Sequence, residues 1–245
     1  MKARLYIIHW SILIIILAVS LSSFGQLSVN TVGYEVTYEI SSGTYSVWVV
    51  PNYNSINSNN PSASEFGATA QVSFKVPTGF IISNITDVKG TWYKTPQKLG
   101  PAEQTQLSGQ GLPAGTSYYV IGKSASETNY GAFSSGVPVK LFTFTGNGCF
   151  GAIEVLTKND PFVTVVESEL SLNTAPSFYS RSGQPSDGGN QSPLEQFDVP
   201  FGSPANCLLA FDDDYTAQAA TPSDQAVLAN DQFNGVTSAT SDSVR

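Results

Sequence analysis

The chain has 245 residues, of which 19 are acidic and 11 are basic, and its formal net charge is −8. An acidic chain disfavours nucleic acids and anionic membrane surfaces as partners, because both carry negative charge themselves. The only histidine is His9, near the N-terminus. Zinc sites and Ser-His-Asp or Cys-His mechanisms depend on imidazole as a ligand or a base. With one histidine so near the N-terminus, these classes of site are close to excluded. The classes that remain are catalysis by carboxylates and no catalysis.

Residues 1–25 are predicted to be a cleaved secretory signal peptide. Lys2 and Arg4 precede an apolar stretch that runs through Val19, and small residues end the segment at Gly25. A membrane anchor would need about 18 to 20 uninterrupted apolar residues, and this apolar core is shorter. Cleavage after Gly25 would deliver the mature protein as a secreted or cell-surface protein, with no membrane insertion once the signal is removed.

Residues 26–172 are predicted to form β-strands, because apolar residues recur there with period two between turn residues. In residues 32–40 the apolar side chains alternate with polar ones, as a strand with one solvated face requires. Residues 66–77 repeat this pattern, and residues 44–51 are apolar on both faces, which favours a central strand. Further strands are expected at 79–89, 116–123, 137–146, 151–157 and 162–172.

No segment of the mature chain shows a convincing helical period. Eight or so strands without intervening helices are typical of an antiparallel sandwich, with a jelly roll or an immunoglobulin-like arrangement as variants. The fold class is therefore expected to be all-β, with a flexible tail at the C-terminal end.

The two cysteines, Cys149 and Cys207, are an even number in an exported chain, which favours a disulfide. Such a bond could stabilise the fold by about 2 to 4 kcal/mol and would tie the main domain to a late strand. The alternative is two unrelated buried thiols.

Two segments are rich in polar and turn-forming residues. Residues 52–66 are expected to be an exposed polar loop between two strands. Residues 173–206 are rich in Ser, Gly and Pro and are interpreted as a linker or a long surface loop. Four aromatic residues in the second segment could still attach it to the sandwich: Phe178, Tyr179, Phe197 and Phe201.

Residues 210–235, "AFDDDYTAQAATPSDQAVLANDQFNG", resemble the start of the tandem cadherin-like or immunoglobulin-like repeats of large bacterial surface proteins. The matching parts are Asp212–Tyr215, Val227–Asp231 and Gly235, whereas "TPSDQA" departs from the expected acidic and Thr-Pro-Val run. The resemblance implies that residues 207–245 are the truncated start of a second module. The chain would then be a fragment of a longer product, or the segment is a remnant that stays disordered.

The same resemblance implies a possible calcium site at a junction between modules. Its candidate ligands are Asp212, Asp213, Asp214, Asn230 and Asp231. Calcium favours six to eight oxygen ligands, so these residues would supply only part of the coordination shell. The alternative is a solvated acidic linker, and the fold requires no cofactor.

The main domain resembles cohesin-like sandwiches of extracellular bacterial proteins in residues 68–90 and 137–162. Cohesins are scaffold modules and not enzymes, so the resemblance implies a sandwich fold and a scaffold role. No dockerin-binding surface can be assigned to particular residues of this chain.

The first functional hypothesis is a non-catalytic extracellular module of a bacterial surface or adhesion protein, whose partners are other extracellular proteins or polysaccharide. The alternative is a carbohydrate-binding module, with Trp92, Tyr93 and Tyr53 as candidate ligand-binding aromatics, while Trp48 is expected in the core. A glycoside hydrolase would need two carboxylates about 5 to 10 Å apart, and no spacing singles out such a pair. The protein is therefore not expected to be an enzyme.

Overall fold

The computed structural model describes residues 30–183, 196–209, 232–233 and 236–237. The predicted signal peptide, residues 1–25, lies outside these residues. So do all five candidate calcium ligands of the C-terminal segment.

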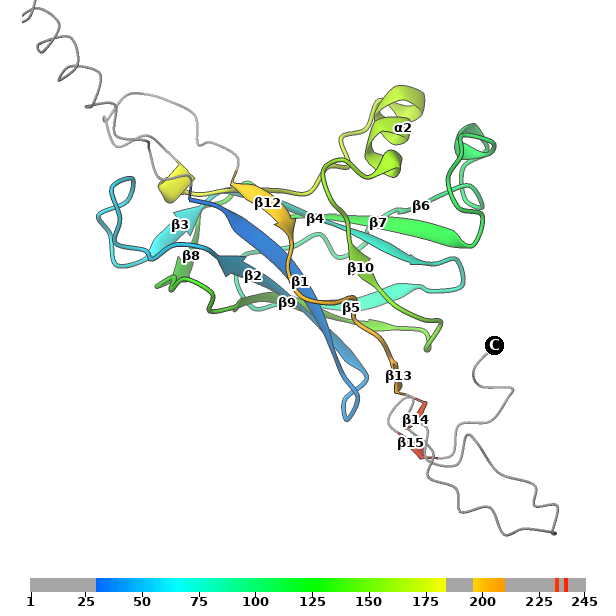
Figure 1. Cartoon of the computed structure of the whole chain (residues 1–245), viewed down its shortest axis with the longest axis horizontal. Coiled ribbons are helices and arrows are strands. Elements are labelled where there is room, and N and C mark those ends of the chain that lie inside the picture. Colours follow the sequence, from blue (N-terminus) through cyan, green and yellow to red (C-terminus); the bar gives the residue numbers. More distant parts are fainter. Residues whose placement is uncertain (1–29, 184–195, 210–231, 234–235, 238–245) are drawn as a thin grey trace, which may run out of the picture.

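Two five-stranded sheets form the body of the chain, which is an all-β sandwich (Figure 1). The first sheet has the order β12 (Phe197–Pro200), β1 (Val32–Glu39), β2 (Thr44–Pro51), β9 (Val139–Gly146) and β5 (Ile82–Asp87). The second has the order β10 (Glu154–Val155), β4 (Thr69–Pro77), β7 (Thr116–Gly122) and β6 (Lys98–Leu99), with β11 (Ser177–Tyr179) also paired to β4. All of these pairings are antiparallel except the parallel one between β1 and β12.

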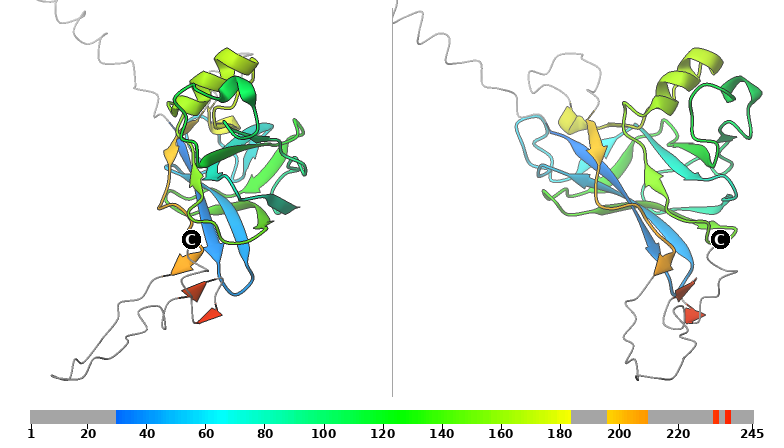
Figure 2. Two further views of the ribbon diagram at one scale, coloured as in Figure 1. Left: turned by 90° about the vertical axis from the view of Figure 1, so that its right-hand side faces the viewer. Right: turned by 45° about the vertical axis from the view of Figure 1, so that its right-hand side comes forward.

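Smaller elements complete the described chain. They are the strand pair β3 (Glu65–Gly67) and β8 (Thr128–Gly131), the three short strands β13 (Leu208–Leu209), β14 (Gln232–Phe233) and β15 (Val236–Thr237), the 3-10 turns η1 (Thr105–Leu107) and η2 (Arg181–Gly183), and the helix α2 (Pro161–Leu170). The β1–β2 hairpin projects from the sandwich (Figure 2). No helix in the described part of the chain is long and apolar enough to span a membrane.

The core lies between the two sheets and follows the alternation of the sequence. β1 contributes Val32, Tyr34 and Val36, and β4 contributes Val72 and Phe74, all of them buried. Burial of these apolar faces supplies the main favourable free energy of folding. The strands expected at 32–40, 44–51, 116–123 and 137–146 are confirmed, and the one expected at 66–77 is divided at Ala68 into the end of β3 and the strand β4.

The segment 162–172 was predicted as a strand, and this prediction is wrong: residues 161–170 form the helix α2. The Asp160 side chain caps the helix by accepting a hydrogen bond from the Phe162 amide at 2.9 Å, and proline occupies the first turn. Phe162 and Val166 recur with helical spacing and are buried.

The helix covers the outer face of the second sheet and builds a second, smaller core there. The ring of Phe162 stacks on that of Tyr118 in β7, with ring centroids 3.8 Å apart. Leu99, Leu107 and Leu156 belong to the same cluster. Because the helix covers only part of this face, the neighbouring part beside β11 stays open.

The predicted end of the sandwich at Leu172 is corrected by the strands that follow it. Residues 173–206 were interpreted as a linker or surface loop, but β11 extends the second sheet and β12 extends the first. The physical reason is apolar burial, since Phe178 and Phe197 both enter the main core. The sandwich therefore continues to residue 207.

A disulfide joins Cys149 to Cys207, with their Cα atoms 5.7 Å apart. Two backbone hydrogen bonds between Ile153 and Ala205 hold the same two segments together. The disulfide and these hydrogen bonds attach the last segment of the sandwich, residues 205–207, to residues 149–153.

Candidate functional site

The three aromatic residues predicted to bind ligand do not lie together on one surface. Trp92 is only 2% exposed, its ring centroid lies 4.6 Å from that of Phe142, and its indole nitrogen donates to the Lys89 carbonyl at 2.8 Å. Tyr53 is 6% exposed, whereas Tyr93 is 67% exposed. The prediction for Trp92 and Tyr53 is therefore wrong, because a buried ring offers no face to a ligand.

Trp48 was expected in the core, but β2 places it on the outer face of the first sheet, where it is half-buried. Its indole nitrogen donates to the Thr37 hydroxyl at 2.9 Å, and the Lys140 ammonium lies 4.5 Å from the ring centroid. Lys140 is the cross-strand neighbour of Trp48 in β9. The cation thus covers this ring and stabilises the sheet face.

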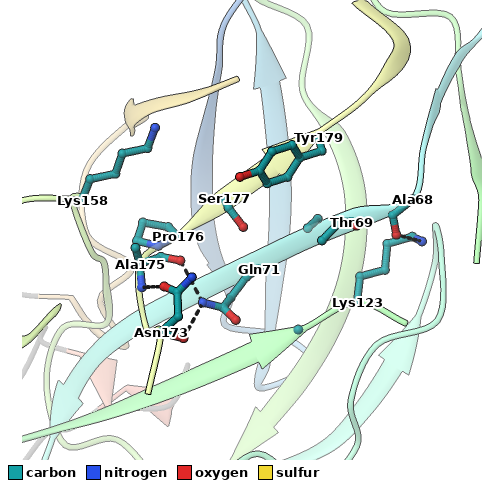
Figure 3. A pocket seen from close by; sticks show the side chains of 12 residues that line it. Ala68, Thr69, Gln71, Lys123, Lys158, Asn173, Ala175, Pro176, Ser177 and Tyr179 are labelled. Atoms are coloured by element: carbon teal, nitrogen blue, oxygen red, sulfur yellow. Dashed lines mark hydrogen bonds between the residues drawn. The ribbon is translucent and has the colours of Figure 1, made fainter. Parts of the chain in front are cut away.

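A groove of about 570 Å³ lies on the outer face of the second sheet, beside the part that α2 covers (Figure 3). The lining residues come from the start of β4 and Ala68 before it, from the end of β7 and Lys123 after it, from Lys158 and from the segment 173–179. Strand alternation places the side chains of Thr69, Gln71, Ser177 and Tyr179 on this face, because Ala70 and Phe178 between them point into the core.

One row of paired residues crosses three strands at the floor of the groove. Ser177 of β11 is opposite Gln71 of β4, and Gln71 is opposite Gly122 of β7. The next row pairs Tyr179 with Thr69. Gly122, at the end of the first row, has no side chain. A Cβ atom at this position would have no heavy atom of another part of the chain within 4 Å.

The wall of the groove is held by hydrogen bonds from β4 to the segment that follows α2. The Gln71 amide nitrogen donates to the carbonyls of Asn173 and Ala175 at 3.2 and 2.8 Å. The Ser73 hydroxyl donates to the Thr174 carbonyl at 2.6 Å. These bonds fix the wall and leave the Gln71 amide oxygen available to a ligand.

Two lysines line the groove, and their environments differ. The Lys123 ammonium donates to the carbonyls of Ala68, Ser124 and Ser126, and burial lowers the pKa of Lys123. Burial also lowers the pKa of Lys158, while the charge of Asp198 opposes this shift. Lys123 is therefore bound to backbone carbonyls, whereas the Lys158 ammonium lies 5.8 Å from the centroid of the Phe197 ring.

A buried polar cluster lies beyond the C-terminal end of β11, and the sequence did not predict it. The Glu65 carboxylate, which is fully buried, accepts hydrogen bonds from the Ser182 amide and hydroxyl at 3.0 and 2.6 Å. Gln196 donates to the Tyr53 hydroxyl at 3.0 Å and accepts from Ser180 at 2.5 Å. This cluster attaches 180–183 to the sandwich.

The segment 52–66, predicted to be an exposed polar loop, is attached to the same cluster. Ser55 and Asn60 are buried, and the Asn59 amide donates to the Ser182 carbonyl at 2.7 Å. The repeated Asn and Ser residues that were interpreted as solvated are used for hydrogen bonds within this part of the domain.

Gly122 was a sequence signal for the groove. It is the last of the outward-facing residues in the strand 116–123, and glycine within a strand can mark a place where a ligand approaches closely. The wall could not be found in this way, because 173–179 was separated from the sandwich.

The described residues that line the groove carry amide and hydroxyl groups, the aromatic ring of Tyr179 and the ammonium groups of Lys123 and Lys158. Among the residues that the structure describes, no three His, Cys, Asp or Glu side chains gather as they would around a metal ion. No protein-family model matches the chain, and no curated protein or solved structure gives a match either.

Proposed function

We propose that the protein is a non-catalytic extracellular β-sandwich module that acts in scaffold, cell-surface or matrix interactions, with other extracellular proteins or polysaccharide as partners. The groove on the second sheet is the observation that carries this proposal. It offers amide and hydroxyl groups to a ligand, and none of the described residues that line it carries a carboxylate or a thiol.

The disulfide supports the extracellular part of the proposal, since such bonds persist in oxidising compartments. The resemblance of the sandwich to scaffold modules points the same way. Calcium binding by Asp212, Asp213, Asp214, Asn230 and Asp231 stays a prediction, and it concerns a segment outside the described residues.

The test is the binding of the purified, oxidised chain, residues 26–245, to the cells that produce it and to their cell-free matrix. We expect saturable binding in a sedimentation assay and no turnover in a panel of chromogenic glycosides. Absence of binding to both preparations would overturn the proposal. Turnover that a single Glu→Gln change abolishes would show that the protein is an enzyme.

A further inference from the structure

The floor of the groove is a straight row of three residues on neighbouring strands. Ser177 of β11 is paired with Gln71 of β4, and Gln71 is paired with Gly122 of β7. Because neighbouring strands lie about 4.8 Å apart, the row is about 10 Å long, which is the length of two linked hexose units. At Gly122 there is open space where a side chain would stand, so a flat ligand can lie on the sheet backbone there.

The polar groups along this row have hydrogen-bonding capacity left for a ligand. Among the described residues, the hydroxyls of Ser177 and Tyr179 have no hydrogen-bond partner. The Gln71 amide nitrogen is bound to the wall, and its amide oxygen points away from Asn173 and Ala175 (Figure 3). Asn173 uses its side-chain oxygen on the Ala175 amide, so its side-chain nitrogen remains. Such a mixture of donors and acceptors suits sugar hydroxyls, which both donate and accept.

Tyr179 adds an aromatic ring at one end of the row. It follows Ser177 by two positions in β11, lies on the same face and is half-buried (Figure 3). Its partner Thr69 belongs to the next row, so the ring stands beside a ligand that lies over Ser177. A tyrosine in this position has an apolar ring and a polar tip. The C–H face of a hexose can pack on the ring while the hydroxyls of the sugar reach the polar groups of the floor.

The charges around the groove favour a neutral ligand. The Lys123 ammonium donates to three backbone carbonyls. The Lys158 ammonium lies over the Phe197 ring, and the charge of Asp198 acts on it. Both cations therefore have partners within the protein, and the described lining residues carry no carboxylate. An acidic sugar would find no unpaired cation over the floor, in a chain whose net charge is already negative.

We propose that this groove binds a neutral polysaccharide of extended, β-1,4-linked hexose units, two units at a time. One unit lies over Gly122, beside the Gln71 amide oxygen. The next unit lies over Ser177 and packs against Tyr179. This inference rests on the proposed function, because it names the ligand of an extracellular binding module.

The test measures binding of cellohexaose and mannohexaose to the oxidised chain, residues 26–245, by isothermal titration calorimetry, with hexagalacturonate as the acidic comparison. Gly122→Leu fills the floor, and the matched control Gly115→Leu adds the same side chain at an exposed turn that also has open space. Tyr179→Ala removes the ring, and its control Tyr93→Ala removes an exposed tyrosine elsewhere.

We expect Gly122→Leu and Tyr179→Ala to weaken binding of the better neutral hexamer by about tenfold or more, while both control variants bind like the parent chain. Affinity should rise steeply from the monosaccharide to the disaccharide and little beyond it, because the row holds two units. It should hardly change between low and high salt, because no charged pair forms. Parent-like melting temperatures confirm that each variant is folded.

Three outcomes would overturn the inference. They are no binding of either neutral hexamer by the parent chain, binding of hexagalacturonate that is as tight or tighter, and folded groove variants that bind like the parent. If the parent chain binds cells or matrix but no neutral hexamer, this inference fails and the proposed function stands. If it binds none of these, both fail.

Discussion

The Glu65 carboxylate shows how a single polar residue can hold two segments that lie far apart in the sequence. Its oxygens accept from the amide and the hydroxyl of Ser182, in a site without solvent exposure. Glu65→Ala should lower the free energy of unfolding by about 2 to 4 kcal/mol, because two buried donors lose their acceptor and a cavity remains. Urea denaturation measures this change. Glu65→Gln keeps one acceptor and should cost less; equal costs for the two variants would contradict this account.

Trp92 and Tyr93 are neighbours in the sequence with opposite environments, so they form a matched pair. Trp92→Ala should cost about 3 to 5 kcal/mol, because the indole packs in the core. Tyr93→Ala should stay within about 0.5 kcal/mol of the parent chain, because its ring is mainly exposed. Chemical denaturation of both variants checks the pair, and similar costs would show that the placement of these rings is wrong.

At the scale of the element, α2 ends at a residue whose backbone is strained. Ser171 follows the helix with φ of 55°, in the left-handed region that favours glycine. Ser171→Gly should raise the free energy of unfolding by about 0.5 to 1 kcal/mol. The control is Ser168→Gly within the helix, which should lower it by a similar amount. Thermal melts followed by circular dichroism compare them, and a loss of stability in both variants would contradict the helix end described here.

At the scale of the whole molecule, the disulfide links residues 58 positions apart. Closing a loop of this size restricts the unfolded chain, and reduction should cost about 4 kcal/mol in the chain-entropy account. We expect a lower urea midpoint in the presence of reductant. A variant with both cysteines changed to serine should start at that lower midpoint and show no response to reductant; a response would mean that reductant acts elsewhere.

The buried tyrosines should make the whole fold sensitive to alkali. Burial raises the pKa of Tyr118 to about 12, and it raises the pKa of Tyr34, Tyr45, Tyr53 and Tyr130 as well. Unfolded tyrosine ionises near pH 10. Their contribution to stability is therefore complete below about pH 10 and is lost as the pH rises toward the folded pKa values.

Burial lowers the pKa of Lys123 and of Lys158, so these two groups act in the opposite direction over the same range. The tyrosines outnumber them, and we expect the urea midpoint to fall steadily above about pH 10. Absorbance of tyrosinate at alkaline pH should rise together with unfolding. Tyrosinate absorbance that rises near pH 10 while the fold stays intact would contradict the buried placement of these rings.

The sequence by itself was enough to predict an all-β fold, because alternation in segments such as 32–40 and 66–77 is a local property of a strand with one wet face. It also indicated the pairing of Cys149 with Cys207, since few alternatives exist for two cysteines. The same local reasoning failed at 161–170, because a short apolar run fits either a strand or a helix. In the structure these residues form a helix, and Phe162 of that helix packs on Tyr118.

Only the tertiary structure decided where the sandwich ends and which side chains surround the groove. The segment 173–206 is polar on average, and its attachment depends on a few buried residues such as Phe178 and on partners more than a hundred positions away, as in the bond from Ser73 to the Thr174 carbonyl. Burial of Trp92 likewise depends on Phe142 of β9, which is distant in the sequence. Periodicity reports which face of a strand is apolar, but the packing of distant segments decides which polar face stays open.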